Sequence, residues 1–196
     1  MKNVHLLSLD NRAHLVQPEE FDELTLKSPA RAIFTDFKKH KPLVIEIDTL
    51  AGDALHLMQK THVHLQLVVD KKNELIGTIS QNEMNEQQFL IKQKHGFDRT
   101  QLTVGDMMIS RDHIKVLHYK LLDVLKIEDL IDLLKEEGMQ HCLVTDPEQE
   151  QIRGIISARD ISRRLHIDVN IEPTQTFAGI FDAVNDSHNY QKQYAF

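Results

Sequence analysis

The sequence contains one internal repeat, and its two copies lie 76 to 77 residues apart. The first copy reads DALHLMQKTHVHLQLVVDKKNELIGTISQNEM from Asp53, and the second reads DLIDLLKEEGMQHCLVTDPEQEQIRGIISARDI from Asp129. Few positions are identical, but the order of features is the same, which predicts two structural units of one design. The positions that coincide are Asp70 with Asp146 and, after a one-residue insertion in the second copy, Gly77 with Gly154, Ser80 with Ser157 and Glu83 with Asp160.

Each copy predicts a helix followed by two strands and a second helix. The first helix has apolar residues at helical spacing and acids near its start. A short apolar run follows, LQLVVD (65–70) or HCLVTD (141–146), and predicts a buried strand. After a polar turn, LIGTIS or IRGIIS predicts a second strand that ends at a serine opening the next helix. One apolar face of each copy would be exposed alone, so we expect the copies to pack on each other.

Composition excludes several classes of partner. The 196 residues are 41% hydrophobic and 27% charged, as expected of one compact domain or two small halves. A net charge of −7 and a pI of about 5.9 argue against binding to nucleic acid or an anionic membrane. No apolar run is long enough to span a bilayer, and no signal peptide is recognisable. The lone Cys142 is expected to be a buried, inert thiol, which fits a cytoplasmic protein.

No catalytic motif is recognisable in the sequence. It lacks a P-loop, a G-x-S-x-G elbow, an H-E-x-x-H helix and a glycine-rich dinucleotide loop, and its seven glycines are scattered. We therefore expect a protein that is not an enzyme and requires no cofactor.

Histidine is abundant, with 12 residues in the chain. His62 and His64 would share one face if THVHLQ is already a strand. Two histidines can ligate zinc, but a site needs three or four ligands and no recognisable spacing supplies the others. We expect histidines that face solvent or line a cleft, and no metal site.

The stretch GIISARDI (154–161) allows two interpretations. Ser157 can cap a helix, with Asp160 completing a short capping box. Alternatively, free N–H groups at a strand-to-helix junction, together with a cation and a carboxylate, form a polar ligand site. In the first copy SQNE (80–83) completes a full S-x-x-E capping box, which needs no ligand.

The order of these elements resembles the cystathionine β-synthase (CBS) domain, and the tandem resembles a Bateman module. The resemblance rests on a helix, an apolar strand that ends at Asp, a turn, and then the pattern G-h-h-[ST]-x-x-[DE]-h, where h is a hydrophobic residue. It covers roughly residues 28–166. The resemblance implies an α/β (α+β) fold of two pseudo-symmetric β-α-β-β-α CBS repeats packed as one Bateman module. The expected boundaries are an N-terminal extension (1–27), repeat 1 with a lead-in strand near 42–45 (28–95), repeat 2 with its lead-in (96–167) and a C-terminal extension (168–196) with a short amphipathic helix over 177–184.

The resemblance also implies a regulatory sensor that binds an adenine nucleotide or related adenosyl ligand between its repeats. Candidate ligands are AMP, ADP, ATP and S-adenosylmethionine. Asp160 would hold the ribose, Ser157 would hold phosphate, and Arg159 or Arg153 would add cationic contacts. The other implied contacts are Ile156 and His141, with weaker ones from Ser80, Asn82 and Glu83 in repeat 1.

The alternative is a structural dimerisation protein whose ligand sites are degenerate. With either function we expect a homodimer and an effector protein yet to be identified. The dimer would be formed by the repeat helices and extended by the 177–184 helix. The apolar residues expected on the dimer faces are Leu55, Leu57 and Met58, then Leu130, Ile131, Leu133 and Leu134.

Overall fold

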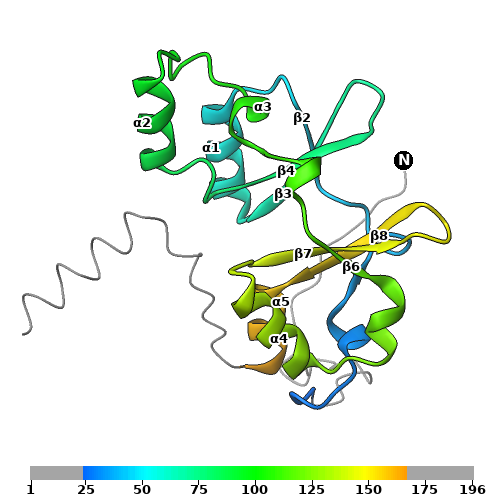
Figure 1. Cartoon of the computed structure of the whole chain (residues 1–196). Helices are drawn as coiled ribbons and strands as arrows, with labels where there is room; N and C mark the ends of the chain where they lie inside the picture. The colour runs from blue at the N-terminus through cyan, green and yellow to red at the C-terminus, as the bar shows by residue number, and fades with distance from the viewer. Residues whose placement is uncertain (1–23, 167–196) are drawn as a thin grey trace, which may run out of the picture.

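Two four-stranded sheets face each other, and helices cover their outer sides (Figure 1). The computed structural model describes residues 24–166. Within these residues no helix is long and apolar enough to cross a membrane. The expected 177–184 helix and most of both predicted extensions lie outside the described residues.

The first sheet has the strand order β2-β3-β4-β5. Its strands are β2 (Val44–Glu46), β3 (Leu65–Val69), β4 (Leu75–Ser80) and β5 (Ile109–Ser110), and its helices are α1 (Ala51–Thr61), α2 (Glu86–Lys94) and α3 (Val104–Met107).

The second sheet has the order β1-β8-β7-β6. Its strands are β1 (Thr35–Asp36), β6 (Val116–His118), β7 (His141–Asp146) and β8 (Gln151–Ser157). Its helices are α4 (Ile127–Glu136) and α5 (Ala158–Leu165), with the short 3-10 turns η1 (Ala30–Ile33) and η3 (Tyr119–Asp123); a further turn, η2 (Arg111–His113), joins β5 to β6. The predicted repeat is thus seen as β2-α1-β3-β4-α2 and β6-α4-β7-β8-α5.

The two copies share fine detail as well as order. Each has a parallel pair, β2 with β3 and β6 with β7, followed by an antiparallel hairpin. Each hairpin has a register shift at the same place, between Val68 and Val69 and between Val144 and Thr145. The alignment of Asp70 with Asp146 therefore describes two equivalent backbones.

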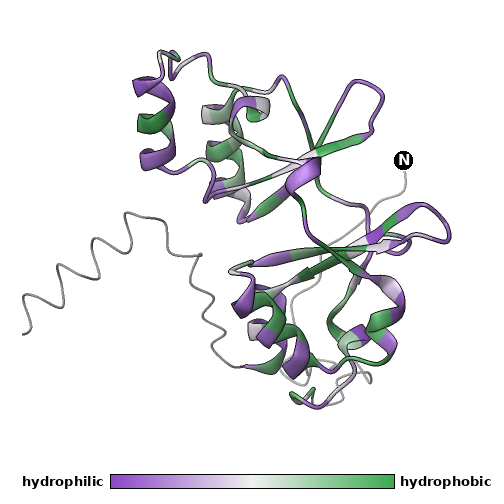
Figure 2. Cartoon of the chain, in the orientation of Figure 1, coloured by the Kyte–Doolittle hydropathy of each residue, from purple (hydrophilic) through white to green (hydrophobic). Residues whose placement is uncertain are grey.

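Each sheet and its helices enclose a separate apolar core. The hydrophobic residues lie on the inner faces of the helices and along the strands (Figure 2). Met58 and Val68 are fully buried in the first core, and Leu134 and Val144 in the second. Cys142 is 4% exposed, and burial raises the pKa of its thiol to about 11, so the thiolate is strongly disfavoured at neutral pH.

This burial changes which residues can form a dimer face. Met58, Leu130, Ile131 and Leu134 pack in their own cores and are not available to a second subunit. Leu57 remains 52% exposed, and Leu90 on α2 is 54% exposed.

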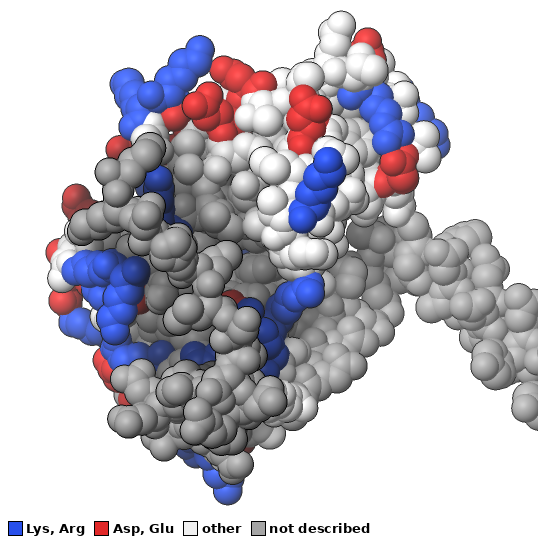
Figure 3. Space-filling model, turned by 180° about the vertical axis from the view of Figure 1, so that it is seen from behind, with Lys and Arg blue, Asp and Glu red and all other residues white. Residues whose placement is uncertain are grey.

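Elsewhere on the surface, side chains of opposite charge are paired. Examples are Arg99–Glu86 at 2.5 Å and Lys71–Asp48 at 3.6 Å. Figure 3 shows basic and acidic side chains close together on one face.

The two halves exchange strands. β1 belongs to the lead-in of the first repeat but pairs antiparallel with β8, with Asp36 opposite Gly154. In the same way β5, from the lead-in of the second repeat, pairs with β4, with Ser110 opposite Gly77. Neither sheet is therefore complete without a strand from the other half of the chain.

The glycine shared by the two copies is explained by this exchange. A Cβ on Gly154 would lie 2.1 Å from the Thr35 backbone oxygen, and one on Gly77 would lie 2.6 Å from that of Ile109. Both positions need glycine because the exchanged strand passes directly over them.

An ion pair fixes β1 on the second sheet. Arg153 on β8 donates from Nε and Nη2 to both carboxylate oxygens of Asp36, at 2.9 and 2.7 Å. The two side chains are only 13% and 14% exposed. This pair holds the pKa of Asp36 at about 2, because Arg153 hydrogen-bonds its ionised form.

Replacing Gly154 by Ala should lower the free energy of unfolding by about 1–3 kcal/mol, because the new methyl group meets backbone. Gly52→Ala is the matched control: the position is exposed on α1 and has nothing within 4 Å of a Cβ. It should instead raise stability by about 0.5–1 kcal/mol through helix propensity. Urea unfolding measures both, and a Gly154 variant as stable as wild type would contradict the close approach.

Asp36→Asn should reduce stability at pH 5, and the difference from wild type should shrink as the pH falls. The pKa of Asp36 is lowered in the folded state, so its contribution is present above about pH 4 and disappears as the pH falls through about 2. Urea unfolding from pH 6 to 2 tests this, with the exposed Asp132→Asn as control. A difference that does not change with pH would exclude the proposed role of the ion pair.

Candidate functional site

Two related cavities lie between the repeats. The Ser80 cleft, of about 160 Å³, is lined by Ser80, Asn82 and Glu83 together with residues 113–115 and 138–141. The Ser157 cleft, of about 410 Å³, is lined by Ser157, Arg159 and Asp160 together with residues 40–43 and 62–65. In both clefts one repeat supplies the serine motif and the other the opposing segment. The two clefts share a wall formed by Leu65, His141 and Ile155.

In the Ser80 cleft the polar motif is hydrogen-bonded to itself. Glu83 Oε2 accepts the Ser80 N–H at 2.7 Å, and Ser80 Oγ accepts the Asn82 N–H at 3.1 Å. The predicted capping role of Glu83 is therefore present, but it closes a turn. The expected helix does not start at Ser80: α2 begins at Glu86, where the Asn85 side chain accepts the Gln88 N–H at 2.9 Å.

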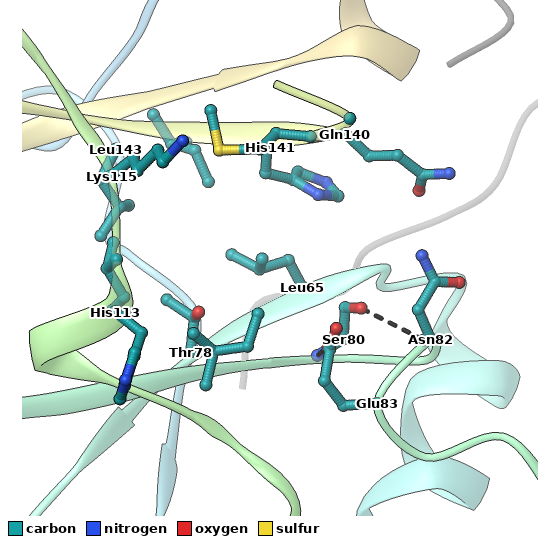
Figure 4. Close-up of a pocket in the computed structure, with 15 residues that line it drawn as sticks. Leu65, Thr78, Ser80, Asn82, Glu83, His113, Lys115, Gln140, His141 and Leu143 are labelled. Atoms are coloured by element: carbon teal, nitrogen blue, oxygen red, sulfur yellow. Dashed lines mark hydrogen bonds between the residues drawn. The ribbon is translucent and has the colours of Figure 1, made fainter. Parts of the chain in front are cut away.

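The basic side chains that line the Ser80 cleft also have partners. Lys115 is paired with Glu137, and His113 Nδ1 lies 2.8 Å from Ser110 Oγ. Asn82 extends toward Gln140 across the cavity, and Leu65 and Thr78 lie along its floor (Figure 4). The cavity is smaller than the roughly 300 Å³ of a usual small-molecule site.

In the Ser157 cleft the motif makes no cap. Ser157 is the N-cap residue of α5, yet its side chain makes no cap hydrogen bond. The Asp160 carboxylate accepts a hydrogen bond from Arg163 Nη2 at 2.7 Å instead, and it remains 33% exposed. The capping interpretation of GIISARDI is thus not what the structure shows, and both side chains line an open cavity.

Arg159 crosses to the other repeat. Its Nη1 is hydrogen-bonded to His64 Nε2, and burial, together with the nearby Arg159 and His62, lowers the pKa of His64. Burial also lowers the pKa of His141 to about 4, with a further contribution from His64 and a partial offset from Asp160. His141 is therefore a neutral imidazole at pH 7.

Two of the suggested ligand contacts lie elsewhere. Ile156 is fully buried in the second core, because successive side chains of a strand point to opposite faces; Ile155 lines the clefts in its place. Arg153 is held by Asp36 and lines a different cavity. Ser157, Arg159, Asp160 and His141 do meet in one cleft.

The structure adds basic residues that the motif did not indicate. His40 and Lys41 come from the β1–β2 loop, and Arg163 lies one turn beyond Asp160 on α5. His62 and His64, expected to face solvent or a cleft, line this one, although β3 starts only at Leu65. Within residues 24–166 no group of three or more His, Cys, Asp or Glu is placed to hold a metal ion.

A comparison with protein families matches the CBS domain at residues 34–86 and 120–167, more than half of the chain. The chain belongs to the CBS domain family, as a tandem pair. A search of curated proteins finds no match.

Solved structures share the fold. An uncharacterized conserved protein from Pyrococcus horikoshii has a TM-score of 0.54 at 16% identity, covering 71% of this chain and 93% of its own. A CBS-domain containing protein from Agrobacterium tumefaciens has a TM-score of 0.52 at 14% identity, covering 75% and 98%. CBSX2 from Arabidopsis thaliana, solved in complex with AMP, has a TM-score of 0.47 at 24% identity, covering 69% of this chain and 94% of its own.

Glu83→Ala should lower the free energy of unfolding by about 1 kcal/mol, because it removes the acceptor of the Ser80 N–H. Asp160→Ala is the matched change in the second copy and should cost less, about 0.5 kcal/mol, since it removes a partly exposed pair with Arg163 and a first-turn acid of α5 but no backbone hydrogen bond. Urea unfolding compares them. Equal losses would contradict the difference between the two motifs.

Proposed function

We propose that this CBS pair is a regulatory module that binds an adenine nucleotide or a related adenosyl ligand in the Ser157 cleft. The observation that carries the proposal is the Asp160 carboxylate, which lines an open cavity without serving as a helix cap. The candidate ligands are AMP, ADP, ATP and S-adenosylmethionine. The proposed role is non-enzymatic: the ligand is bound and released unchanged.

The groups present suit the two ends of a nucleotide. A carboxylate accepts hydrogen bonds from both hydroxyls of a ribose. The N-terminus of α5, an eight-residue helix, presents a positive dipole end to phosphate, although its first N–H, that of Ala158, is donated to the Gln140 carbonyl at 2.9 Å; the unused Ser157 hydroxyl lies beside it. His141 adds a neutral ring on the shared wall.

Only one of the two clefts is proposed as a working site. In the Ser80 cleft the carboxylate of Glu83 is already hydrogen-bonded to backbone and Lys115 is ion-paired, within a small cavity. The Ser157 cleft has the larger volume and the exposed carboxylate.

A ligand in this cleft would touch both repeats, because Arg159 and Asp160 come from one and residues 62–65 from the other. Binding would therefore favour one relative arrangement of the repeats, which a homodimer partner or an effector protein can recognise.

The free, buried thiol of Cys142 is compatible with action in the cytoplasm.

The alternative function is structural dimerisation with degenerate sites. The exposed Leu57 and Leu90 on the outer helices of repeat 1 favour it. A thermal-shift panel of the candidate ligands separates the two, because a true ligand at 100 times its Kd stabilises by about 2.7 kcal/mol. A dimer by light scattering that responds to none of them would favour the alternative.

Asp160→Ala should weaken binding of the best nucleotide about ten- to hundredfold, because a hydrogen bond to a charged acceptor contributes about 1.5–3 kcal/mol. Titration calorimetry measures the Kd, with Asp160→Asn as the variant that keeps the size and the exposed Asp132→Ala as control. Removing Asp160 also frees Arg163 from its hydrogen bond, and a free Arg163 would strengthen binding to phosphate. A loss of affinity in Asp160→Ala therefore reports the missing contact with the ribose.

The 2′,3′-dideoxy form of the same nucleotide makes the test specific. It lacks the diol, so Asp160→Ala should change its Kd less than threefold. Equal affinity of wild type and Asp160→Ala for the ribose form would refute the proposed site.

A further inference from the structure

Basic and titratable side chains from both repeats surround the Ser157 cleft. They are His40, Lys41, His62 and His64 from the first half of the chain, and Arg159 and Arg163 from α5. The chain as a whole carries a net charge of −7. A cleft of opposite sign in an acidic protein concentrates anions.

The contact between Arg159 and His64 defines the protonation state of His64 in this cleft. A guanidinium can only donate, so His64 Nε2 must accept and the imidazole is neutral. Desolvation and the charge of Arg159 both disfavour a proton on His64, and His62 adds to this. The Arg159 guanidinium is therefore held against an uncharged imidazole.

The remaining ionisable groups of the cleft have other roles. Asp160 is the acid that lines it, and it is paired with Arg163. His141 lies on the shared wall, and burial lowers its pKa to about 4. The groups left to respond to an anion are thus Lys41 and Arg159 as fixed charges, and His64, whose ring already contacts Arg159.

We propose that the Ser157 cleft binds a phosphorylated ligand whose phosphates lie between the two repeats, and that binding takes up a proton from solvent onto His64. This deepens the proposed function, on which it rests, by naming the anionic class of nucleotide. Phosphate replaces His64 as the acceptor for Arg159, and protonated His64 then donates to phosphate. The adenosyl sulfonium of S-adenosylmethionine, a cation, gains nothing from this lining.

The sign of the pH dependence follows from proton uptake. A ligand that binds the protonated form more tightly loses affinity as the pH rises. Uptake of about half to one proton raises the Kd about three- to tenfold per pH unit near neutrality. The second pKa of a phosphate is about 6, so above pH 7 the ligand itself is already ionised and the change must come from the protein.

Titration calorimetry of ADP at pH 7.5, in two buffers with different heats of ionisation, counts the protons. Wild type should take up about half to one proton per ADP, and adenosine should bind without uptake. His64→Gln should lose at least half of the uptake. The exposed His56→Gln on α1, outside the cleft, should behave as wild type.

Inorganic pyrophosphate separates this inference from the proposed function. If pyrophosphate binds with proton uptake but neither ADP nor adenosine binds, the anion site is supported and the nucleotide function fails. ADP binding without uptake, or uptake unchanged in His64→Gln, would overturn the inference and leave the nucleotide function standing. Binding of neither ADP nor pyrophosphate would overturn both.

Discussion

The exchange of strands across the centre of the molecule is the constraint on which the rest of the structure depends. β1 and β5 leave their own halves and pass over glycines of the opposite sheets, with no room for a side chain at Gly154 or Gly77. β1 is hydrogen-bonded to β8 of the second sheet, and β5 to β4 of the first. The two cores therefore cannot separate without exposing strand edges. The clefts are a by-product of this geometry: they are the spaces left where two twisted sheets face each other.

The duplicated design does not make the two clefts alike. Glu83 has one more methylene than Asp160, and it reaches back to the Ser80 N–H; the shorter Asp160 turns to Arg163. The opposing segments also differ, since residues 62–64 supply two histidines where the equivalent segment 138–140 supplies none. Small differences at equivalent positions thus leave one motif hydrogen-bonded within its own turn and the other lining an open polar cleft.

The long apolar strands could be predicted from the sequence because each is a continuous run bounded by turn residues. HCLVTD and LIGTIS match β7 and β4 residue for residue. β1 and β5 could not be predicted in the same way, since each has only two residues and no periodicity. The motif residues of the Ser157 cleft could be recognised from the sequence. His40 and Lys41 could not, because the β1–β2 loop brings them to the cleft and no sequence pattern indicates the path of that loop. Ile156 was misplaced by one residue, which on a strand reverses the side-chain direction.

The pairing of β1 with β8 also determines when β1 can join a sheet during synthesis of the chain. Asp36 and Arg153 are 117 residues apart, so the N-terminal strand has no partner until nearly the whole second repeat has left the ribosome. The hairpin β3–β4 and the helix α1 are local and can form earlier. The first repeat can therefore form its β2–β3–β4 pairing while β1 is still unpaired, and β8 completes both the second sheet and the cleft that lies against it.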